Sequence, residues 1–272
     1  MKIWAHTRVK NEDRFIWYAL DSIVRWVDRI IVWDTGSSDT TLKIVQAAQK
    51  FFGGQIEFKQ IGEVSRENMP HVREEMLRQT QADWVINLDG DEVWWESSIY
   101  QLTDLIRSKG HKIESVFVKT INPVGDIYHF QPKEAGFYQI AGRRGHLNLR
   151  AFSTKIPGLH VGGSYPGEAY LDKSGIQIQD RKPNFLDVSY LHLTHLERST
   201  NKDFVVGRSA KFAYELGIEA PLDFYYPEAF FRTRPSFIPS PWTGISKQYF
   251  IRALVETPPK RFKRNIRSKI TP

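Results

Sequence analysis

The sequence predicts an α/β fold in which a mainly parallel, twisted sheet is flanked by helices. Two runs of β-branched and aromatic residues, 29–33 and 84–88, are typical of buried strands. The segments between the runs carry apolar residues at helical spacing. Repeated strand–helix units favour parallel strands, because each crossover helix returns the chain to the same end of the sheet.

The first hundred residues alternate between the two kinds of element. A strand over 2–8 precedes a helix whose apolar face holds Ile16, Ala19, Leu20, Ile23 and Val27. The following elements are a strand at 29–33, a helix at 40–52, a strand at 56–60, a helix at 71–80 and a strand at 84–88. In such sheets, ligands bind at the carboxyl ends of the strands.

Residues 97–200 are less regular and rich in Gly and Pro. We expect strands at 114–121, 147–152 and 185–193. A helix over 202–216 should end at Gly217, and an aromatic, proline-rich segment follows it. We expect this helical and irregular C-terminal extension to pack over the main domain or to form an oligomer contact.

Composition excludes several classes of protein. The 272 residues are 41% hydrophobic and 25% charged, which is ordinary globular usage, and there is no cysteine to form a disulfide, a thiolate nucleophile or a Cys-based zinc site. No apolar stretch could span a bilayer, and the start lacks a signal-peptide pattern, so we expect a cytoplasmic protein. The glycine-rich, serine-elbow and phosphate-loop motifs of dehydrogenases, serine hydrolases and kinases are missing.

Three acids cluster directly after the apolar run 84–88: Asp89, Asp91 and Glu92. Clustered carboxylates at a strand end suit a hard divalent cation that holds the phosphates of a nucleotide. The plainer interpretation is a turn with Gly90 at its tip and its acids in water. The preceding strand, and a second acidic loop upstream, favour the metal site.

That second loop runs from Asp34 to Thr41 and follows the strand at 29–33. The pattern predicts a strand, a tight turn and a helix N-terminus. A carboxylate at this position can bind the base or ribose of a nucleotide while free N–H groups face phosphate. A capped turn with no ligand explains the loop equally well.

Together these segments resemble the family 2 glycosyltransferases. The resemblance includes Val9-Lys10-Asn11-Glu12, the stretch 28–41 and the stretch 83–92; it covers roughly residues 1–95 and extends more loosely to about 200. It implies the glycosyltransferase A fold, which is of the nucleotide-diphospho-sugar transferase type. It also implies a nucleotide-diphospho-sugar donor, with Mn²⁺ or Mg²⁺ at the Asp-x-Asp motif.

The resemblance also implies roles for individual residues. By position, Asn11, Glu12 and Asp34 would line the nucleotide pocket, and Asp89 and Asp91 would meet the metal and diphosphate. Arg73 lies where relatives place a basic residue that contacts the donor. A charged side chain that faces solvent on a helix explains it equally well.

Relatives commonly place a histidine near the end of the strand at 185–193 to complete the metal site, and His192 and His195 are the candidates. They fall on opposite faces if the strand continues through both, so at most one should reach the metal, and we favour His192. A buried histidine bonded to the backbone is the alternative for each.

Transfer to a hydroxyl gains from a general base, because the nucleophile loses its proton as the bond forms, and direct displacement would invert the anomeric carbon. The candidates are Glu168, Asp172 and Asp180. We favour Glu168, because the stretch from Leu149 to Glu168 loosely resembles the family's segment from Arg-x-Phe to a carboxylate. This chain has Gly167 where relatives often have histidine.

We therefore predict a catalytic domain over 1–215, with a donor-binding half (1–96) and an acceptor half (97–215), followed by an extension over 216–272. The acceptor could be a glycan, a lipid-linked molecule or a protein. Six Lys or Arg and no acid lie in residues 258–272, out of a net charge of +7. Phe262, Ile266 and Ile270 recur every four residues, as in a peripheral anchor on an anionic membrane, although a solvated tail is an equal alternative.

Two other functions fit part of the sequence. A nucleotidyltransferase would use the same nucleotide and metal chemistry, but the Gly-rich basic loop typical of that class is missing near the start. A noncatalytic nucleic-acid or nucleotide-binding protein would explain the basic tail and the aromatics, but it leaves the acidic loop without a role, so a nucleic-acid partner is not expected.

Overall fold

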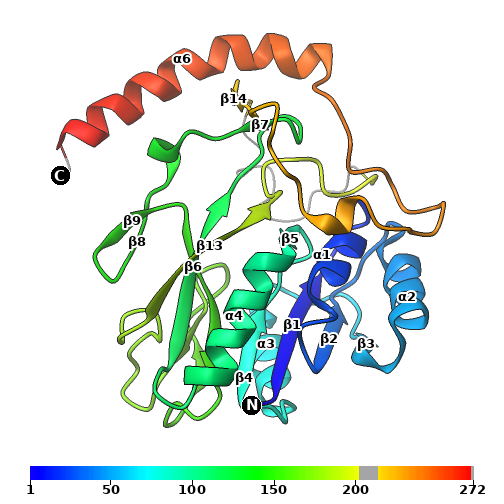
Figure 1. The fold of residues 1–272 in the computed structure, drawn as a ribbon, viewed down its shortest axis with the longest axis vertical. Helices are drawn as coiled ribbons and strands as arrows, with labels where there is room; N and C mark the ends of the chain where they lie inside the picture. The colour runs from blue at the N-terminus through cyan, green and yellow to red at the C-terminus, as the bar shows by residue number, and fades with distance from the viewer. Residues whose placement is uncertain (202–213, 271–272) are drawn as a thin grey trace.

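One sheet organises the computed structural model, which describes residues 1–201 and 214–270 (Figure 1). Within these residues the sheet has eight strands. In spatial order they are β3 (Ile56–Gln60), β2 (Arg29–Asp34), β1 (Ile3–Val9), β4 (Trp84–Asn87), β10 (Leu147–Ser153), β6 (Ser115–Ile121), β13 (Asn184–His192) and β5 (Glu92–Trp94). The first four strands are parallel, β6 and β13 are parallel to each other, and β10 and β5 run antiparallel to their neighbours.

This architecture confirms the predicted fold class. All seven predicted strands are present, with bounds that differ by at most one residue. The prediction missed the short strand β5 and the helix α4 (Glu96–Lys109). We expected less regular structure from residue 97 onward, but Ile99, Leu102 and Ile106 are buried at helical spacing on α4. The predicted helix over 202–216 falls mainly on 202–213, outside the described residues.

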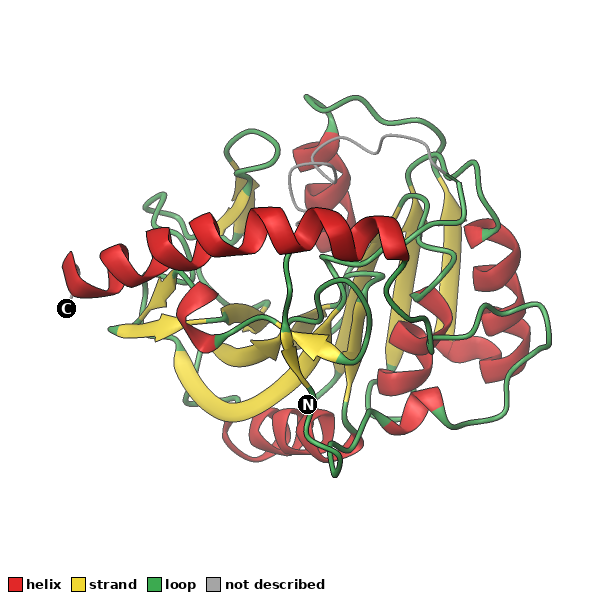
Figure 2. Ribbon diagram, turned by 90° about the horizontal axis from the view of Figure 1, so that it is seen from above, coloured by secondary structure: helices red, strands yellow, loops and turns green. Residues whose placement is uncertain are grey.

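Helices cover both faces of the sheet (Figure 2). α1 (Ile16–Ile23), α2 (Thr41–Phe52) and α4 share one core with Ala5 and Val32. α3 (Met69–Arg78) packs against the opposite face, where Val72 and Met76 contact Trp4 and Trp33. Alternate strand residues thus face opposite layers, as the period of two requires.

Parallel pairing brings the ends of β1, β2 and β4 to one edge of the sheet. Asp34 is the last residue of β2, and the segments that follow β1 and β4 contain Asn11 and Asp89. Asn11 has φ of 54°, a left-handed conformation that asparagine adopts more readily than most residues, and it turns the chain sharply there. The topology therefore gathers the polar loops before any side-chain contact is considered.

Three short two-stranded sheets lie outside the main sheet in the described residues. They are β7 (His129–Phe130) with β14 (Ile218–Glu219), β8 (Tyr138–Ile140) with β9 (Arg143–Gly145), and β11 (His160–Gly162) with β12 (Ala169–Leu171). Single 3-10 turns lie at η1 (Gly53–Gln55), η2 (Lys133–Ala135) and η3 (Glu228–Phe230). The β11–β12 hairpin packs on the α3 side of the sheet through Tyr170, which contacts Phe152 of β10.

The C-terminal extension packs onto the main domain. Phe230 lies 5.2 Å from Tyr18 between ring centroids, and Trp95 donates a hydrogen bond to the carbonyl of Tyr225. The chain then forms the long helix α6 (Lys247–Ile270). Phe230 belongs to the main hydrophobic core. The boundary between a catalytic domain and an extension at residue 215 stays a prediction. No helix in the described ranges is both long and apolar enough to cross a bilayer.

Candidate functional site

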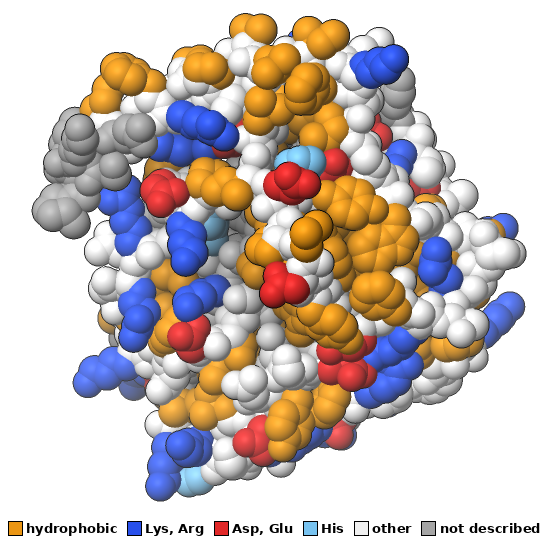
Figure 3. All heavy atoms as spheres, turned by 45° about the horizontal axis from the view of Figure 1, so that its top comes forward, with side chains coloured by type: hydrophobic (Ala, Val, Ile, Leu, Met, Phe, Trp, Pro, Cys, Tyr) orange, Lys and Arg blue, Asp and Glu red, His pale blue; other side chains and the backbone are white. Residues whose placement is uncertain are grey.

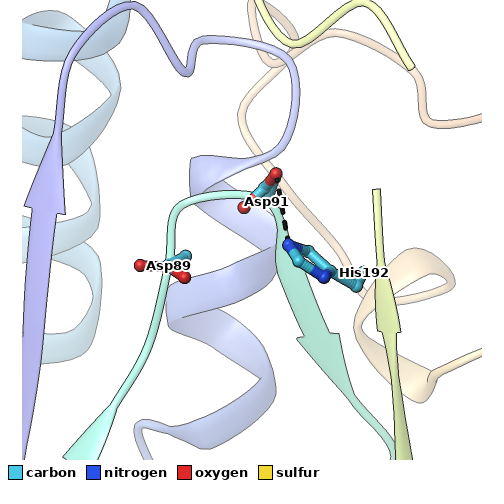
Figure 4. A group of neighbouring side chains, drawn as sticks. All are labelled: Asp89, Asp91 and His192. Atoms are coloured by element: carbon cyan, nitrogen blue, oxygen red, sulfur yellow. Dashed lines mark ion pairs between the residues drawn. The ribbon is translucent and has the colours of Figure 1, made fainter. Parts of the chain in front are cut away.

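Three potential metal ligands meet at the edge formed by the strand ends (Figure 4). Asp89 and Asp91 lie in the loop between β4 and β5, and His192 ends β13. Their ligand atoms lie within 4.8 Å of one another, and Nε2 of His192 is 3.8 Å from Oδ2 of Asp91. His195, the other histidine considered from the sequence, lies beyond the end of β13 and is not part of this group.

The donor set fits a divalent cation. Two carboxylates and an imidazole suit Mn²⁺, and the carboxylates suit Mg²⁺. Burial lowers the pKa of His192 to about 4, so its imidazole is neutral and able to ligate at neutral pH. Oδ1 of Asp91 is buried, and no donor among the described residues reaches it.

Arg198 balances the charge of Asp91. Its guanidinium contacts Oδ2 of Asp91 and lies 3.4 Å from Oε1 of Glu12. Burial alone would raise the pKa of Asp91, but Arg198 holds it below its usual value. Glu12, predicted to line the nucleotide pocket, is thereby joined to the metal loop.

Arg150 holds the other side of the acidic loop. Its Nη2 lies 3.4 Å from Oδ2 of Asp89 and contacts Glu92, while Nε donates to the hydroxyl of Tyr190 at 2.7 Å. Burial beside Asp89 and Asp91 raises the pKa of Glu92 well above its usual value. Glu92 also accepts the N–H of Asp89 at 3.2 Å, so it braces the loop.

A cavity of about 50 Å³ adjoins Asp89 and is lined mainly by polar side chains, with Met76 among them. Arg8 and Arg73 enter it from β1 and α3, and both contact Glu168: Oε1 accepts from Arg8 at 3.1 Å and from Arg73 at 3.5 Å. The Arg73 guanidinium also stacks 5.3 Å from the ring centroid of Tyr170. Of the predicted site residues, Arg73 thus lines the cavity beside Asp89, and Glu168 contacts it from behind the lining through Arg8 and Arg73.

Asp34 and Asn11 shape the adjacent loop. Oδ1 of Asp34 accepts the N–H groups of Gly36 and Ser37, both at 3.0 Å. Oδ1 of Asn11 accepts the N–H of Ser38 at 2.7 Å and so ties the loop to the end of β1. Oδ2 of Asp34 is buried, and the described part of the chain offers it no donor. This oxygen is therefore a buried acceptor without a hydrogen-bond donor among the described residues.

Asp172 and Asp180, the other base candidates, are not brought to this group. Asp172 accepts the N–H groups of Ser174 and Ile176 at 2.8 and 3.0 Å and contacts Arg181, so it braces the turn after β12. Asp180 is exposed on the surface.

A second cavity, of about 260 Å³, lies beside His192. His192, His195 and His146 line it together with Arg264 of α6. Since His192 also belongs to the metal group, this cavity and that group share a wall.

Three arginines of the site, Arg8, Arg150 and Arg198, are not predicted from the sequence, whereas Arg73 is. Arg8 and Arg150 lie inside apolar strands, and a charge in such a run was a usable signal, because arginine is seldom buried without a partner. Arg73 was named, but its contact with Glu168 could not be foreseen. Arg198 lies in an ordinary polar segment that gives no signal.

A comparison with protein families decides the classification. Residues 7–162 match the family model described as glycosyl transferase family 2. The chain belongs to glycosyl transferase family 2. The match covers Asn11, Asp34, Asp89, Asp91 and Arg150, whereas His192 and Arg198 lie beyond it.

One solved structure shows the same overall fold, and a second is similar over a smaller part of the chain. S. aureus TarS 1-349 in complex with UDP-GlcNAc is 15% identical, with a TM-score of 0.51, over 75% of this chain and 62% of that chain. Glucosyl-3-phosphoglycerate synthase from Mycobacterium tuberculosis, with Mn²⁺, UDP-Glc and phosphoglyceric acid, is 24% identical, with a TM-score of 0.35, over 44% of each chain. The chain spans less than two thirds of the length of these two structures. No curated protein matches.

Gly90 is the point where the metal loop packs against Glu12. A Cβ added there would lie 2.9 Å from Cγ of Glu12. We expect Gly90→Ala to destabilise the protein by about 1–3 kcal/mol, because Glu12 must move away from Arg198. Gly54→Ala is the control, since a Cβ at Gly54 meets nothing within 4 Å. Urea unfolding of both variants checks this, and equal stabilities would contradict the packing argument.

Proposed function

We propose that this family member transfers a sugar from a nucleotide-diphospho-sugar to an acceptor hydroxyl, with Mn²⁺ or Mg²⁺ held by Asp89, Asp91 and His192. The observation that carries the proposal is the three-ligand group at the strand ends, of which Asp89 also lines the cavity that holds Arg8 and Arg73. A bound cation would neutralise the diphosphate and stabilise it as a leaving group.

The donor would bind across these features. Oδ2 of Asp34 accepts a hydrogen bond from the base or ribose, as its buried and unsatisfied state requires. Arg8 and Arg73 face the phosphates beside Asp89, since a guanidinium pairs well with phosphate oxygens. Arg150 and Arg198 hold the acidic loop in place.

In a direct displacement, the acceptor oxygen bonds to the anomeric carbon, the bond to the diphosphate breaks and the nucleoside diphosphate leaves. The acceptor proton passes to a general base, for which Glu168 is our candidate, and the anomeric carbon inverts. The family match lends no support to a nucleotidyltransferase or a nucleic-acid binder.

A thermal-shift panel tests the proposal directly. The protein is melted with uridine, guanosine, adenosine, cytidine and thymidine diphosphates and with nucleotide-sugars that include UDP-GlcNAc, each with and without Mn²⁺. We expect the nucleotides that carry one particular base to raise Tm, and only when Mn²⁺ is present. A ligand raises Tm only if it binds the native state. No rise for any nucleotide would contradict a donor site.

Asp34→Asn probes the nucleotide contact separately. The amide oxygen of Asn can still accept from Gly36 and Ser37, but an NH₂ replaces the buried acceptor Oδ2. We expect nucleotide binding to weaken by roughly 10- to 100-fold, as loss of a hydrogen bond to a charged group predicts. Calorimetric titration measures this, with Asp187→Asn on the exposed surface as control. An unchanged Kd would remove Asp34 from the site.

A further inference from the structure

Helix α6 is held to the body by one side only. Tyr249, Ala253 and Thr257, spaced four residues apart, are buried on that side. Farther along the same side, Arg264 pairs with the buried carboxylate of Glu215, with Nη2 2.9 Å from Oε2. These contacts fix the rotation of the helix and therefore decide which side chains face outward.

The outward side is apolar. We call this set the outer face of α6: six large apolar side chains that are 42 to 73% exposed, namely Phe250, Ile251, Leu254, Val255, Phe262 and Ile266. At 1.5 Å per residue it runs about 24 Å along the helix. A continuous apolar strip of this kind on a soluble domain marks an interaction surface.

Positive charge borders this strip. α6 contains eight Lys or Arg and one Glu, which accounts for the whole net charge of +7. Lys247, Arg252, Arg261 and Lys263 are exposed, while Glu256 is paired with Lys260 at 2.8 Å. Figure 3, in which the top of Figure 1 comes forward, shows orange apolar side chains beside blue Lys and Arg on this part of the molecule. An apolar strip bordered by cations is complementary to an anionic lipid surface.

We propose that the outer face of α6 docks flat on an anionic lipid bilayer, with its apolar side chains among the acyl chains and its Lys and Arg at the headgroups. The docking is independent of the proposed sugar transfer. A second copy of the chain fits less well, because pairing two such helices would bring their positive charges together.

Two prolines limit how deep the helix can lie. Pro258 and Pro259 are on the exposed side and have no N–H, so they give no helical hydrogen bond to the carbonyls of Leu254 and Val255. Water and headgroups can satisfy these carbonyls at the interface, but the hydrocarbon interior cannot. The helix therefore lies at the level of the headgroups.

Vesicle co-sedimentation of the full chain tests the docking. The vesicles contain equal parts of phosphatidylcholine and phosphatidylglycerol, with pure phosphatidylcholine alongside. We expect binding to the anionic vesicles only, at least about tenfold weaker when Ile251, Val255 and Phe262 are all changed to Ser. Leu222→Ser with Phe231→Ser, which removes exposed apolar groups elsewhere, should leave binding unchanged. Arg252→Gln with Lys263→Gln should weaken it about tenfold and reduce its salt dependence.

Three results would overturn the proposal. The first is no binding by the unaltered protein, and the second is equal binding by the triple-serine variant. The third is a dimer in solution that the same variant dissociates, which would assign the outer face to a second copy. Tm and the nucleotide-induced thermal shift, measured on every variant, separate loss of docking from loss of folding or of the donor site.

Discussion

Asp91→Asn is expected to abolish metal-dependent donor binding and to lower the rate of sugar transfer by roughly 10³-fold. A decrease of this size corresponds to the loss of several kcal/mol of transition-state stabilisation by the cation. Asp91 is the fully buried member of the ligand group, and its Oδ1 has no donor within the described residues. Asn keeps the shape but replaces an anionic ligand with a neutral one. Titration with Mn²⁺ and nucleotide, followed by a radiolabelled-sugar transfer assay, measures both effects.

Asp172→Asn is the matched control. Asp172 is also buried and paired with an arginine, but it lies outside the ligand group. Both variants break a comparable ion pair, so both should lose a similar amount of stability, whereas only Asp91→Asn should lose metal-dependent binding. Full turnover by the Asp91 variant, or equal loss of donor binding in both, would remove Asp91 from the metal site.

Glu168→Gln is expected to lower kcat by roughly 10²-fold and to leave the KM for the donor nearly unchanged. The amide oxygen of Gln can still accept from Arg8 and Arg73, so the arginines keep their positions while the proton acceptor is lost. Steady-state kinetics with a saturating acceptor separates the two parameters.

Glu168→Ala distinguishes catalysis from positioning. This variant removes both the base and the partner of Arg8 and Arg73, so it should raise KM in addition to lowering kcat. If Glu168→Gln transfers sugar at the normal rate while Glu168→Ala binds the donor poorly, Glu168 positions the arginines and the general base lies elsewhere.

The strands of the sheet could be predicted because their signals are local. Runs such as Arg29–Asp34 and Trp84–Asn87 are apolar, β-branched and short, and their order along the chain implies parallel pairing. Helix α4 was missed because its buried residues are diluted by polar ones, and only packing against β13 and α1 makes them a core face.

Site residues at the ends of strands could be predicted from the sequence. Contacts between segments far apart in the chain could not. Asp34 ends β2, and Asp89 and Asp91 lie in the loop after β4, so topology alone gathers them. The pairing of Arg198 with Asp91, or of Glu168 with Arg8, joins residues more than a hundred positions apart. Such contacts depend on how the loops close in three dimensions, which no short-range pattern records.

The pairing of Arg198 and Arg150 with the acidic loop bears on how the fold tolerates chelators. In a site whose carboxylates repelled one another without a cation, removing the metal would cost folding energy, as it does in zinc fingers. Here two guanidinium groups already offset that repulsion, so the scaffold should not depend on the ion. Treatment with EDTA should therefore silence the enzyme but leave it folded, with a melting temperature lowered only by the stabilisation that the bound ion itself contributes, and restoring Mn²⁺ should return activity without any refolding step.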